Sequence, residues 1–242
     1  MIWLIGNKGM LGTELSECFV WNGMEFFGTD RECDIVDPVA LHAACAGKNV
    51  RWIINCAAYT AVDKAEDEPE LARRINAAGP GNIAAVAKEI GAKLIHISTD
   101  YVFDGAGTKP YEEDDPVGPT GMYGQTKVEG EVLVRTACPE HFILRTAWLY
   151  GMYGNNFVQT MLKLLESKDS IGVVADQRGS PTWARDLSEA IAAIVMRDST
   201  EYGTYHFTDE GDISWHDFAL EIQRLGLRYG ILSHAIPVKP LR

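Results

Sequence analysis

The distribution of hydrophobic residues along the chain predicts buried strands that alternate with amphipathic helices. Short, almost wholly apolar runs indicate strands that are covered on both faces. Such runs occupy approximately residues 1–5, 24–29, 51–56, 93–98 and 141–147. Helical spacing of apolar residues between them predicts helices at about residues 10–20, 38–47, 69–90 and 123–137. Because parallel strands need helical crossovers, we predict an α/β fold with a Rossmann-like, doubly wound parallel sheet.

Glycine and proline mark the irregular parts of this pattern. The long helical run should be broken or bent around residues 79–81, and Gly91 is placed to cap its end. Residues 105–121 contain several Gly and Pro residues and an acidic cluster, which predicts a loop. A loop of this length between a strand and a helix is typical of a lid or a binding segment.

After about residue 148 the pattern changes to shorter units. Helices are expected at about residues 157–167 and 184–197, strands at about 171–175 and 203–208, and a capping box at Ser214 opens a last helix. We predict that these units form a small lobe over the carboxyl edge of the sheet. Two domains follow: residues 1–148 bind the dinucleotide and carry the catalytic residues, and residues 149–242 form the substrate lobe. The two should pack as one unit, with interleaving as the alternative arrangement.

Composition and charge narrow the class of protein. A chain of 242 residues with 46% apolar residues can bury one sizeable core. The net charge of −12 disfavours binding to nucleic acid or to an anionic membrane. Five cysteines without C-x-x-C spacing suggest neither a disulfide framework nor a zinc site. The first strand has no basic leader and is too short to span a membrane, so we expect a cytoplasmic protein.

The first predicted turn contains glycines at positions 6, 9 and 12. Glycines permit a tight bend and let a pyrophosphate approach the backbone, while the amino terminus of the next helix offers N–H groups to the anion. The spacing is G-x-x-G-x-x-G, a modified form of the dinucleotide fingerprint, and ordinary turn glycines are the alternative.

Asp30, at the end of the second predicted strand, favours a dinucleotide over an ordinary turn. Its carboxylate suits the ribose hydroxyls of NADH, whereas the adjacent Arg31 suits the 2′-phosphate of NADPH, so both cofactors stay open. Asp34 and Ile35 follow as candidates for the adenine pocket, with a turn acid before Pro38 as the alternative for Asp34.

Tyr123 and Lys127 share one face of a predicted helix, and a strand-end hydroxyl precedes them in the chain. We predict that the lysine ammonium stabilises the phenolate and lowers the pKa of Tyr123 from its usual value of about 10, which makes Tyr123 a proton donor. A hydroxyl from Ser98 or Thr99 can hydrogen-bond a substrate carbonyl at the edge where such sheets bind ligands. Alternation along the strand favours Thr99. These groups predict a hydride-transfer site.

Longer motifs extend the pattern and carry a resemblance. They are residues 6–12 (GNKGMLG), 55–66 (NCAAYTAVDKAE), 98–105 (STDYVFDG), 123–127 (YGQTK), 145–151 (RTAWLYG), 154–157 (GNNF) and 176–182 (DQRGSPT). With these motifs the chain resembles the extended short-chain dehydrogenase/reductases and, within them, the dTDP-4-dehydrorhamnose reductase family. The resemblance implies NADPH- or NADH-dependent reduction of the C4 ketone of dTDP-4-dehydro-L-rhamnose.

The resemblance also implies roles for individual residues. It selects Thr99, Tyr123 and Lys127 as the catalytic set. The remaining implied cofactor contacts are Gly9, Met10, Leu11, Asp30, Asp34, Ile35, Ala58, Tyr59, Thr60 and Ile97. The implied contacts to the sugar nucleotide are Thr99, Asp100, Trp148, Asn156 and Gln177. An indole face can cover the C–H face of a sugar, so Trp148 has a physical reason to contact the sugar rather than only to pack in the core.

Further implications concern assembly and chain length. Some relatives form homodimers aided by Mg2+, and Glu14 and Glu189 fall at matching positions, with solvated surface carboxylates as the alternative. Relatives usually continue with an Arg-Pro segment and further helices, so we expect part of the lobe to be absent or remodelled here.

Two other functions compete with the reductase. An epimerase that retains NAD would use the same tyrosine and lysine. A non-catalytic NADP-binding subunit is the other, since a related fold serves as the regulatory partner of methionine adenosyltransferase. The presence of Thr99, Tyr123 and Lys127 argues against this second alternative.

Overall fold

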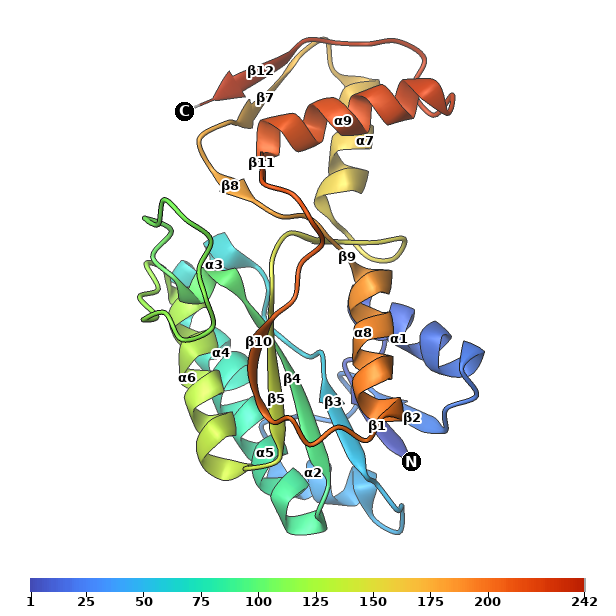
Figure 1. The fold of residues 1–242 in the computed structure, drawn as a ribbon, viewed down its shortest axis with the longest axis vertical. Helices are drawn as coiled ribbons and strands as arrows, with labels where there is room; N and C mark the ends of the chain where they lie inside the picture. The colour runs from blue at the N-terminus through green and yellow to red at the C-terminus, as the bar shows by residue number, and fades with distance from the viewer. Residues whose placement is uncertain (242) are drawn as a thin grey trace.

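The structure, a computed structural model, describes residues 1–241, and Arg242 of the predicted lobe lies outside this range. Its main body is a six-stranded sheet in which every strand pairing is parallel (Figure 1). From one edge to the other, the strands are β10 (Gly203–His206), β5 (His141–Thr146), β4 (Lys93–Thr99), β3 (Trp52–Asn55), β1 (Ile2–Ile5) and β2 (Phe26–Thr29). The predicted Rossmann-like, doubly wound sheet is confirmed.

Helices cover both faces of this sheet (Figure 1). One face carries α2 (Pro38–Cys45), α5 (Gly79–Ile90) and α6 (Met122–Ala137), and the other carries α1 (Met10–Trp21) and α8 (Ala184–Met196). Successive strand residues point to opposite faces, so that Ile53 lies in the first core and Ile54 in the second. Among residues 1–241, no helix has the length and apolar character needed to cross a membrane.

The predicted helix over residues 69–90 is divided into three parts. Its parts are α4 (Pro69–Arg73), a π-helical turn η1 (Arg74–Ala78) and α5, preceded by α3 (Val62–Asp67), which was not predicted. The predicted break around residues 79–81 lies beside this division, because the π-helical turn ends at Ala78 and α5 begins at Gly79, with helical backbone continuing through the junction. The irregularity is the π-helical turn, which carries the buried Asn76. Gly91 ends α5 with φ 69°, as predicted.

A smaller lobe stands above the carboxyl edge of the sheet (Figure 1). It contains α7 (Phe157–Ser167), α9 (Trp215–Arg228) and the parallel pair of β7 (Ile171–Val174) and β12 (Val238–Leu241) around a core of its own. The short strands β6 (Leu149–Tyr150), β8 (Arg178–Gly179), β9 (Thr182–Trp183) and β11 (Ile213–Ser214) pair as β6 with β9 and β8 with β11.

Two elements that we placed in the lobe belong to the main body instead. Helix α8 packs against α1, and β10 extends the sheet beside β5. The chain therefore leaves the main body after β5, returns for α8 and β10, and leaves again for α9, so the two parts are interleaved. Hydrophobic periodicity shows that an element buries one face, but it does not show which neighbour covers that face.

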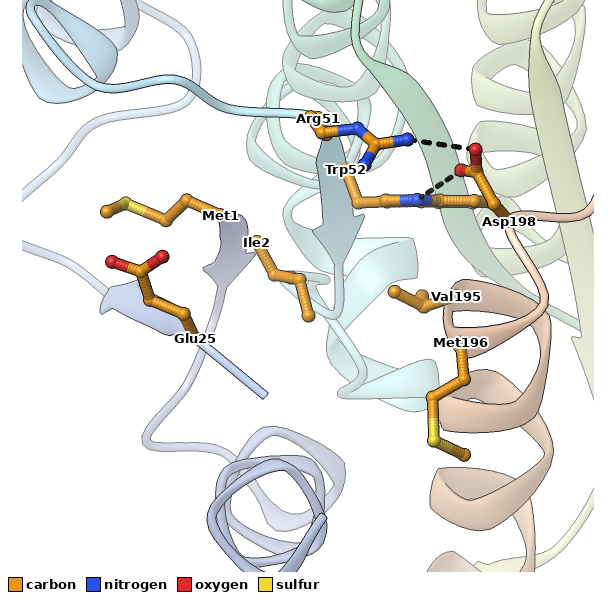
Figure 2. Close-up of a pocket in the computed structure, with 8 residues that line it drawn as sticks. All are labelled: Met1, Ile2, Glu25, Arg51, Trp52, Val195, Met196 and Asp198. Atoms are coloured by element: carbon orange, nitrogen blue, oxygen red, sulfur yellow. Dashed lines mark hydrogen bonds and ion pairs between the residues drawn. The ribbon is translucent and has the colours of Figure 1, made fainter. Parts of the chain in front are cut away.

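Asp198 joins this returning segment to the amino edge of the sheet. Its carboxylate accepts hydrogen bonds from Arg51 (2.9 Å), from the indole of Trp52 (3.2 Å) and from Lys93 (3.0 Å), and its φ is 48°. Figure 2 shows the Arg51 and Trp52 contacts beside a surface pocket. This pocket lies at the amino ends of β1 and β3, opposite to the edge where parallel sheets bind ligands.

Candidate active site at the carboxyl edge of the sheet

Thr99 and Tyr123 meet at the carboxyl end of β4. Thr99 is the last residue of this strand, Tyr123 is the second residue of α6, and both are buried. The Thr99 hydroxyl interacts with the Tyr123 phenol and donates a hydrogen bond to Asp100 Oδ1 at 2.9 Å. It also accepts the backbone N–H of Tyr101 at 3.2 Å. The structure thus brings two hydroxyls and a carboxyl group together at the edge that the sequence analysis indicated.

Ser98 and Thr99 face different surroundings. The Ser98 hydroxyl donates to Glu131 at 2.6 Å, and that carboxylate also pairs with Arg145 at 2.8 Å on the α6 side of the sheet. Burial would raise the pKa of Glu131, but hydrogen bonds from Arg145 and Ser98 hold it below its usual value. Ser98 is therefore engaged in a buried ionic network on the α6 side, whereas Thr99 is held only by its neighbours Asp100 and Tyr101 at the end of the strand, which favours Thr99 as the hydroxyl that meets a ligand.

Lys127 lies one helical turn beyond Tyr123 and is almost wholly buried. Its Nζ donates a hydrogen bond to the Ile97 carbonyl at 2.7 Å. Burial lowers the pKa of Lys127 to about 8, against the opposing influence of Glu131 and Cys56. At neutral pH the side chain is thus mainly an ammonium, but one that titrates close to physiological pH.

The predicted lowering of the Tyr123 pKa is wrong for this structure. The pKa of Tyr123 is raised above its usual value, because burial disfavours the phenolate and the nearby Asp100 adds negative charge, with the Thr99 hydroxyl partly opposing the rise. The Lys127 ammonium is directed to the Ile97 carbonyl. A neutral phenol at pH 7 is nevertheless the form that a proton donor requires.

The glycine turn is packed so closely against backbone atoms that side chains could not replace the hydrogens of Gly6 and Gly12. Gly6 has φ +78°, and a Cβ on Gly12 would lie 2.1 Å from the Gly6 carbonyl oxygen. Within the described residues, the buried Asn7 Oδ1 has no hydrogen-bond partner. Helix α1 starts directly after this turn, so its first N–H groups face the same edge. A backbone cradle, helix N–H donors and a free acceptor fit the phosphates and hydroxyls of a dinucleotide.

The predicted adenosine contacts follow β2. Backbone N–H groups of Gly6 and Asn7 donate to the Thr29 carbonyl at 2.7 and 3.2 Å, which places Asp30 beside the glycine turn. Arg31 is exposed there. The structure therefore presents both a carboxylate and a guanidinium next to the turn, in agreement with either form of the cofactor.

The other predicted cofactor residues lie in two loops. Asp34 accepts the Val36 N–H at 2.9 Å as a turn residue, and Ile35 is buried against Gly79. Tyr59 lies in the Ala58–Thr60 segment after β3, and Asn76 holds its backbone N–H and carbonyl at 2.8 and 3.0 Å. Met10 and Leu11 open α1, and Ile97 provides the carbonyl that binds Lys127.

The predicted sugar-nucleotide residues differ in how they are held. Trp148 has the unusual φ of 49° and stacks on Trp215 of the lobe, with ring centroids 3.5 Å apart. Asn156 caps α7: its Oδ1 accepts the Gln159 N–H at 3.1 Å, and its Nδ2 donates to the Gly151 carbonyl at 2.8 Å. Gln177 is exposed on the lobe. Asp100 and Trp148 are thus the members closest in the chain to the strand ends that carry the site.

The sequence analysis missed several buried polar residues around the site. They are Asn55, Asn76, His96, Glu131 and Thr146. Thr146 is the β5 partner of Thr99, and its hydroxyl has no hydrogen-bond partner among residues 1–241. A polar residue inside an otherwise apolar strand, as at Asn55 and His96, was the available signal.

Glu14 and Glu189 do not form a metal site in the part of the chain that the structure describes. Glu14 is buried, with Oε1 3.5 Å from the Met152 N–H, whereas Glu189 is exposed and pairs with Arg185 at 3.2 Å. No three His, Cys, Asp or Glu side chains gather as metal ligands anywhere in residues 1–241. We therefore derive no chemistry from a metal ion.

The fold is a doubly wound parallel sheet with a glycine turn before its first helix, and its site has a Tyr-x-x-x-Lys pair beside a strand-end threonine. Together these features define a short-chain dehydrogenase/reductase. The family model described as the RmlD substrate binding domain matches residues 1–239. A dTDP-4-dehydrorhamnose reductase from Streptomyces griseus is 43% identical over 229 residues, which cover 92% of this chain and 75% of that protein. The chain belongs to the dTDP-4-dehydrorhamnose reductase family.

Solved structures agree with this membership. The dTDP-4-dehydrorhamnose reductase from Clostridium acetobutylicum has a TM-score of 0.92 and 44% identity, and the match covers 99% of this chain and 83% of that one. The enzyme of the same name from Bacillus anthracis, solved in complex with NADP, has a TM-score of 0.92 and 39% identity, with the same coverage of both chains.

Proposed function

We propose that this chain reduces the C4 ketone of dTDP-4-dehydro-L-rhamnose to dTDP-L-rhamnose with NADPH or NADH. The observation that carries the proposal is the contact of Thr99 with Tyr123 at the carboxyl edge, one turn from Lys127, in a chain of this family. Several relatives whose sequences align with most of this chain bear the name of this reductase.

The side chains divide the work at the ketone. Bound nicotinamide supplies the hydride for the C4 carbon of the sugar. The Thr99 hydroxyl, whose one hydrogen is donated to Asp100 Oδ1 in the structure, would turn that hydrogen to the carbonyl oxygen and stabilise the negative charge that develops there. Tyr123, neutral at pH 7, gives its proton to this oxygen and becomes a phenolate. Lys127 lies one turn away on α6, and its ammonium would turn from the Ile97 carbonyl toward the phenolate and favour it until a proton from solvent restores the phenol.

The cofactor proposal rests on the fit of the glycine turn. The Gly6 to Gly12 cradle and the unpaired Asn7 Oδ1 are suited to a dinucleotide. Asp30 and Arg31 would contact the adenosine ribose as hydroxyl or as 2′-phosphate, respectively. The NADP bound to the Bacillus anthracis relative supports the phosphorylated form.

We also propose that the lobe of α7 and α9 holds the sugar nucleotide, with Trp148 against the deoxysugar. A cytoplasmic location agrees with five cysteines that are all free thiols. The homodimer and Mg2+ stay predictions from the resemblance.

The test is a direct assay of the purified protein. We expect loss of nicotinamide absorbance when dTDP-4-dehydro-L-rhamnose is added with NADPH or NADH, and formation of dTDP-L-rhamnose in equal amount. Oxidation of neither cofactor would contradict the proposal. Tightly bound NAD without net consumption of reduced cofactor would instead support the epimerase.

A further inference from the structure

A chain of buried polar side chains lies behind Lys127. His96 and Asn55 are both essentially inaccessible to solvent. His96 Nε2 lies 3.5 Å from Lys127 Nζ, and His96 Nδ1 lies 3.1 Å from Asn55 Nδ2. Neither of these contacts takes part in the proposed reaction. The His96 ring and the Asn55 amide are nevertheless buried beside the ionisable amine of Lys127, and buried polar groups of this kind need compatible hydrogen-bond partners.

The partners of Asn55 determine which nitrogen of His96 carries the proton. The Ala57 backbone N–H donates to Asn55 Oδ1 at 3.0 Å, so the Asn55 amide group faces His96. An amide NH2 only donates, so His96 Nδ1 must accept, and the neutral imidazole carries its hydrogen on Nε2. The ring is neutral because burial, with the adjacent Lys127 charge, holds the pKa of His96 well below its usual value.

This tautomer presents a donor to Lys127. An ammonium also has only donors, so it finds no acceptor on His96 and is directed to the Ile97 carbonyl, 2.7 Å from Nζ. We propose that Asn55 and His96 together are positioning residues for Lys127: they deny its ammonium an acceptor in the protein interior and hold it against the Ile97 carbonyl. The inference deepens the proposed function, because it names the neighbours that fix the ammonium of Lys127, a member of the proposed catalytic set.

The other groups that face Lys127 leave this role to His96. The Glu131 charge is already paired with Arg145 and Arg135. Loss of solvent around the Cys56 thiol raises its pKa to about 12, so the thiol is uncharged at neutral pH. Tyr123, from the same helix, is also uncharged. His96 is therefore the neighbour of Lys127 in which a single substitution can change Nε2 from a hydrogen-bond donor to an acceptor.

The first experiment observes the tautomer in the unaltered protein. Long-range 1H–15N correlation spectra distinguish imidazoles protonated on Nε2 from those protonated on Nδ1, and His96→Gln identifies the His96 signals. We expect His96 to be neutral and protonated on Nε2 at pH 7. His141 is the internal reference, because its Nδ1 lies 2.6 Å from the Cys138 carbonyl and must carry the hydrogen. A His96 signal of the Nδ1–H form, or of a charged ring, overturns the proposal.

The second experiment uses the Asn55→Asp variant to change His96 Nε2 from a donor to an acceptor toward Lys127. A carboxylate keeps the acceptor for Ala57 and adds one for His96 Nδ1, so Nε2 becomes an acceptor for the ammonium. We expect the Lys127 titration, followed by 13C-lysine NMR, to move upward by about one pH unit or more, with the alkaline limb of turnover moving alongside. Asn22→Asp, at the exposed end of α1, controls for net charge and should move neither. The field of the buried carboxylate itself is measured in the Asn55→Asp, His96→Gln double variant, which has no imidazole to relay the contact: an upward shift as large as that of Asn55→Asp alone overturns the proposal.

The outcomes separate this inference from the proposed function. Both NMR measurements need no substrate, so they decide the role of His96 even if the protein reduces no sugar nucleotide. A changed tautomer with an unchanged Lys127 titration overturns the link between the two residues. If Asn55→Asp does not fold, the spectrum of the unaltered protein still decides the tautomer on which the proposal depends.

Discussion

Single side chains at the site owe their protonation states to burial. Tyr123 and Lys127 are both withdrawn from solvent, and burial favours the uncharged form of each: it raises the pKa of the phenol and lowers that of the amine. In the proposed reaction the two residues therefore start as a neutral phenol and as an ammonium that is easily deprotonated. Both properties lead to measurable consequences.

Replacing Tyr123 by Phe removes the proton donor and leaves the ring. We expect kcat to fall by about two to four orders of magnitude, the usual contribution of a general acid, with little change in the Kd of NADPH. Steady-state kinetics and fluorescence titration measure the two quantities. Tyr101→Phe is a matched control, because this ring packs edge-on against Tyr123 and is partly exposed, and it should keep a rate near that of the unaltered protein. An active Tyr123→Phe enzyme would exclude the role.

The pKa of Lys127 predicts the alkaline limb of the pH profile. The ammonium is present below its pKa of about 8 and is lost above it, so kcat/KM, which reports groups of the free enzyme, should decrease as pH rises through about 8. An unperturbed lysine would give this decrease near 10.4. The value of kcat/KM measured from pH 6 to 10 checks the position of the limb, and Lys127→Met should be slow at every pH and lack it. A constant rate up to pH 10 in the unaltered protein argues against a catalytic ammonium.

At the scale of elements, the helix that carries Tyr123 and Lys127 is positioned by close backbone packing. Helix α6 lies against the π-helical turn η1, and Gly130 is at their contact. Asn76, in the same turn, binds the Tyr59 backbone and donates to Thr126 of α6 at 3.2 Å. The segment of residues 58–60, which we predict to contact the cofactor, and the helix that carries Tyr123 and Lys127 therefore share one support.

Gly130→Ala tests this packing. A Cβ at this position would lie 2.1 Å from the Asn76 carbonyl oxygen, so the two elements must separate. We expect a loss of about 1–3 kcal/mol in the free energy of unfolding, measured by urea denaturation, and a lower kcat. Gly118→Ala is the control, since its Cβ would meet only an ordinary contact at 3.8 Å. Equal stability of the two variants would contradict the proposed tight contact.

Across the whole molecule, the lobe meets the sheet body through an aromatic stack. Trp148 follows β5, and Trp215 begins α9 in the lobe core. Their rings are nearly parallel, with an interplanar angle of 13°. The positive φ of Trp148 shows that the backbone is held in an uncommon conformation at this junction, which is typical of functional positions.

Trp215→Ala removes one partner of this stack. Such pairs contribute about 0.5–1.5 kcal/mol beyond their buried area, so we expect the KM for the sugar nucleotide to rise about two- to tenfold. The Kd of the nicotinamide cofactor should stay unchanged, because the glycine turn lies in the other part of the molecule. Leu220→Ala, on the exposed side of α9, is the control. Equal weakening of both ligands would indicate general unfolding instead.

The local hydrophobic pattern was sufficient to predict some helices and strands but not others. Strands and helices with strong periodicity, such as β4 and α6, were predicted within one residue at each end. The short α3 and the π-helical turn were not, because six residues carry little periodicity and a π turn depends on what packs against it. Thr99, Tyr123 and Lys127 could be selected from motifs. Asn55 and His96 stand out only as polar residues in apolar strands, and their pairing with each other and with Lys127 could not be predicted, since these partners are distant in the chain.

The sequence by itself determined the parallel sheet, the glycine turn and the face shared by Tyr123 and Lys127. Each of these follows from residues within one turn, one strand or one crossover. Only the tertiary structure decided that α8 and β10 return to the main sheet, that the phenol pKa is raised, and which neighbours hold Lys127. The physical reason is that burial and hydrogen-bond partners are set by contacts between distant segments, and local patterns do not record those contacts.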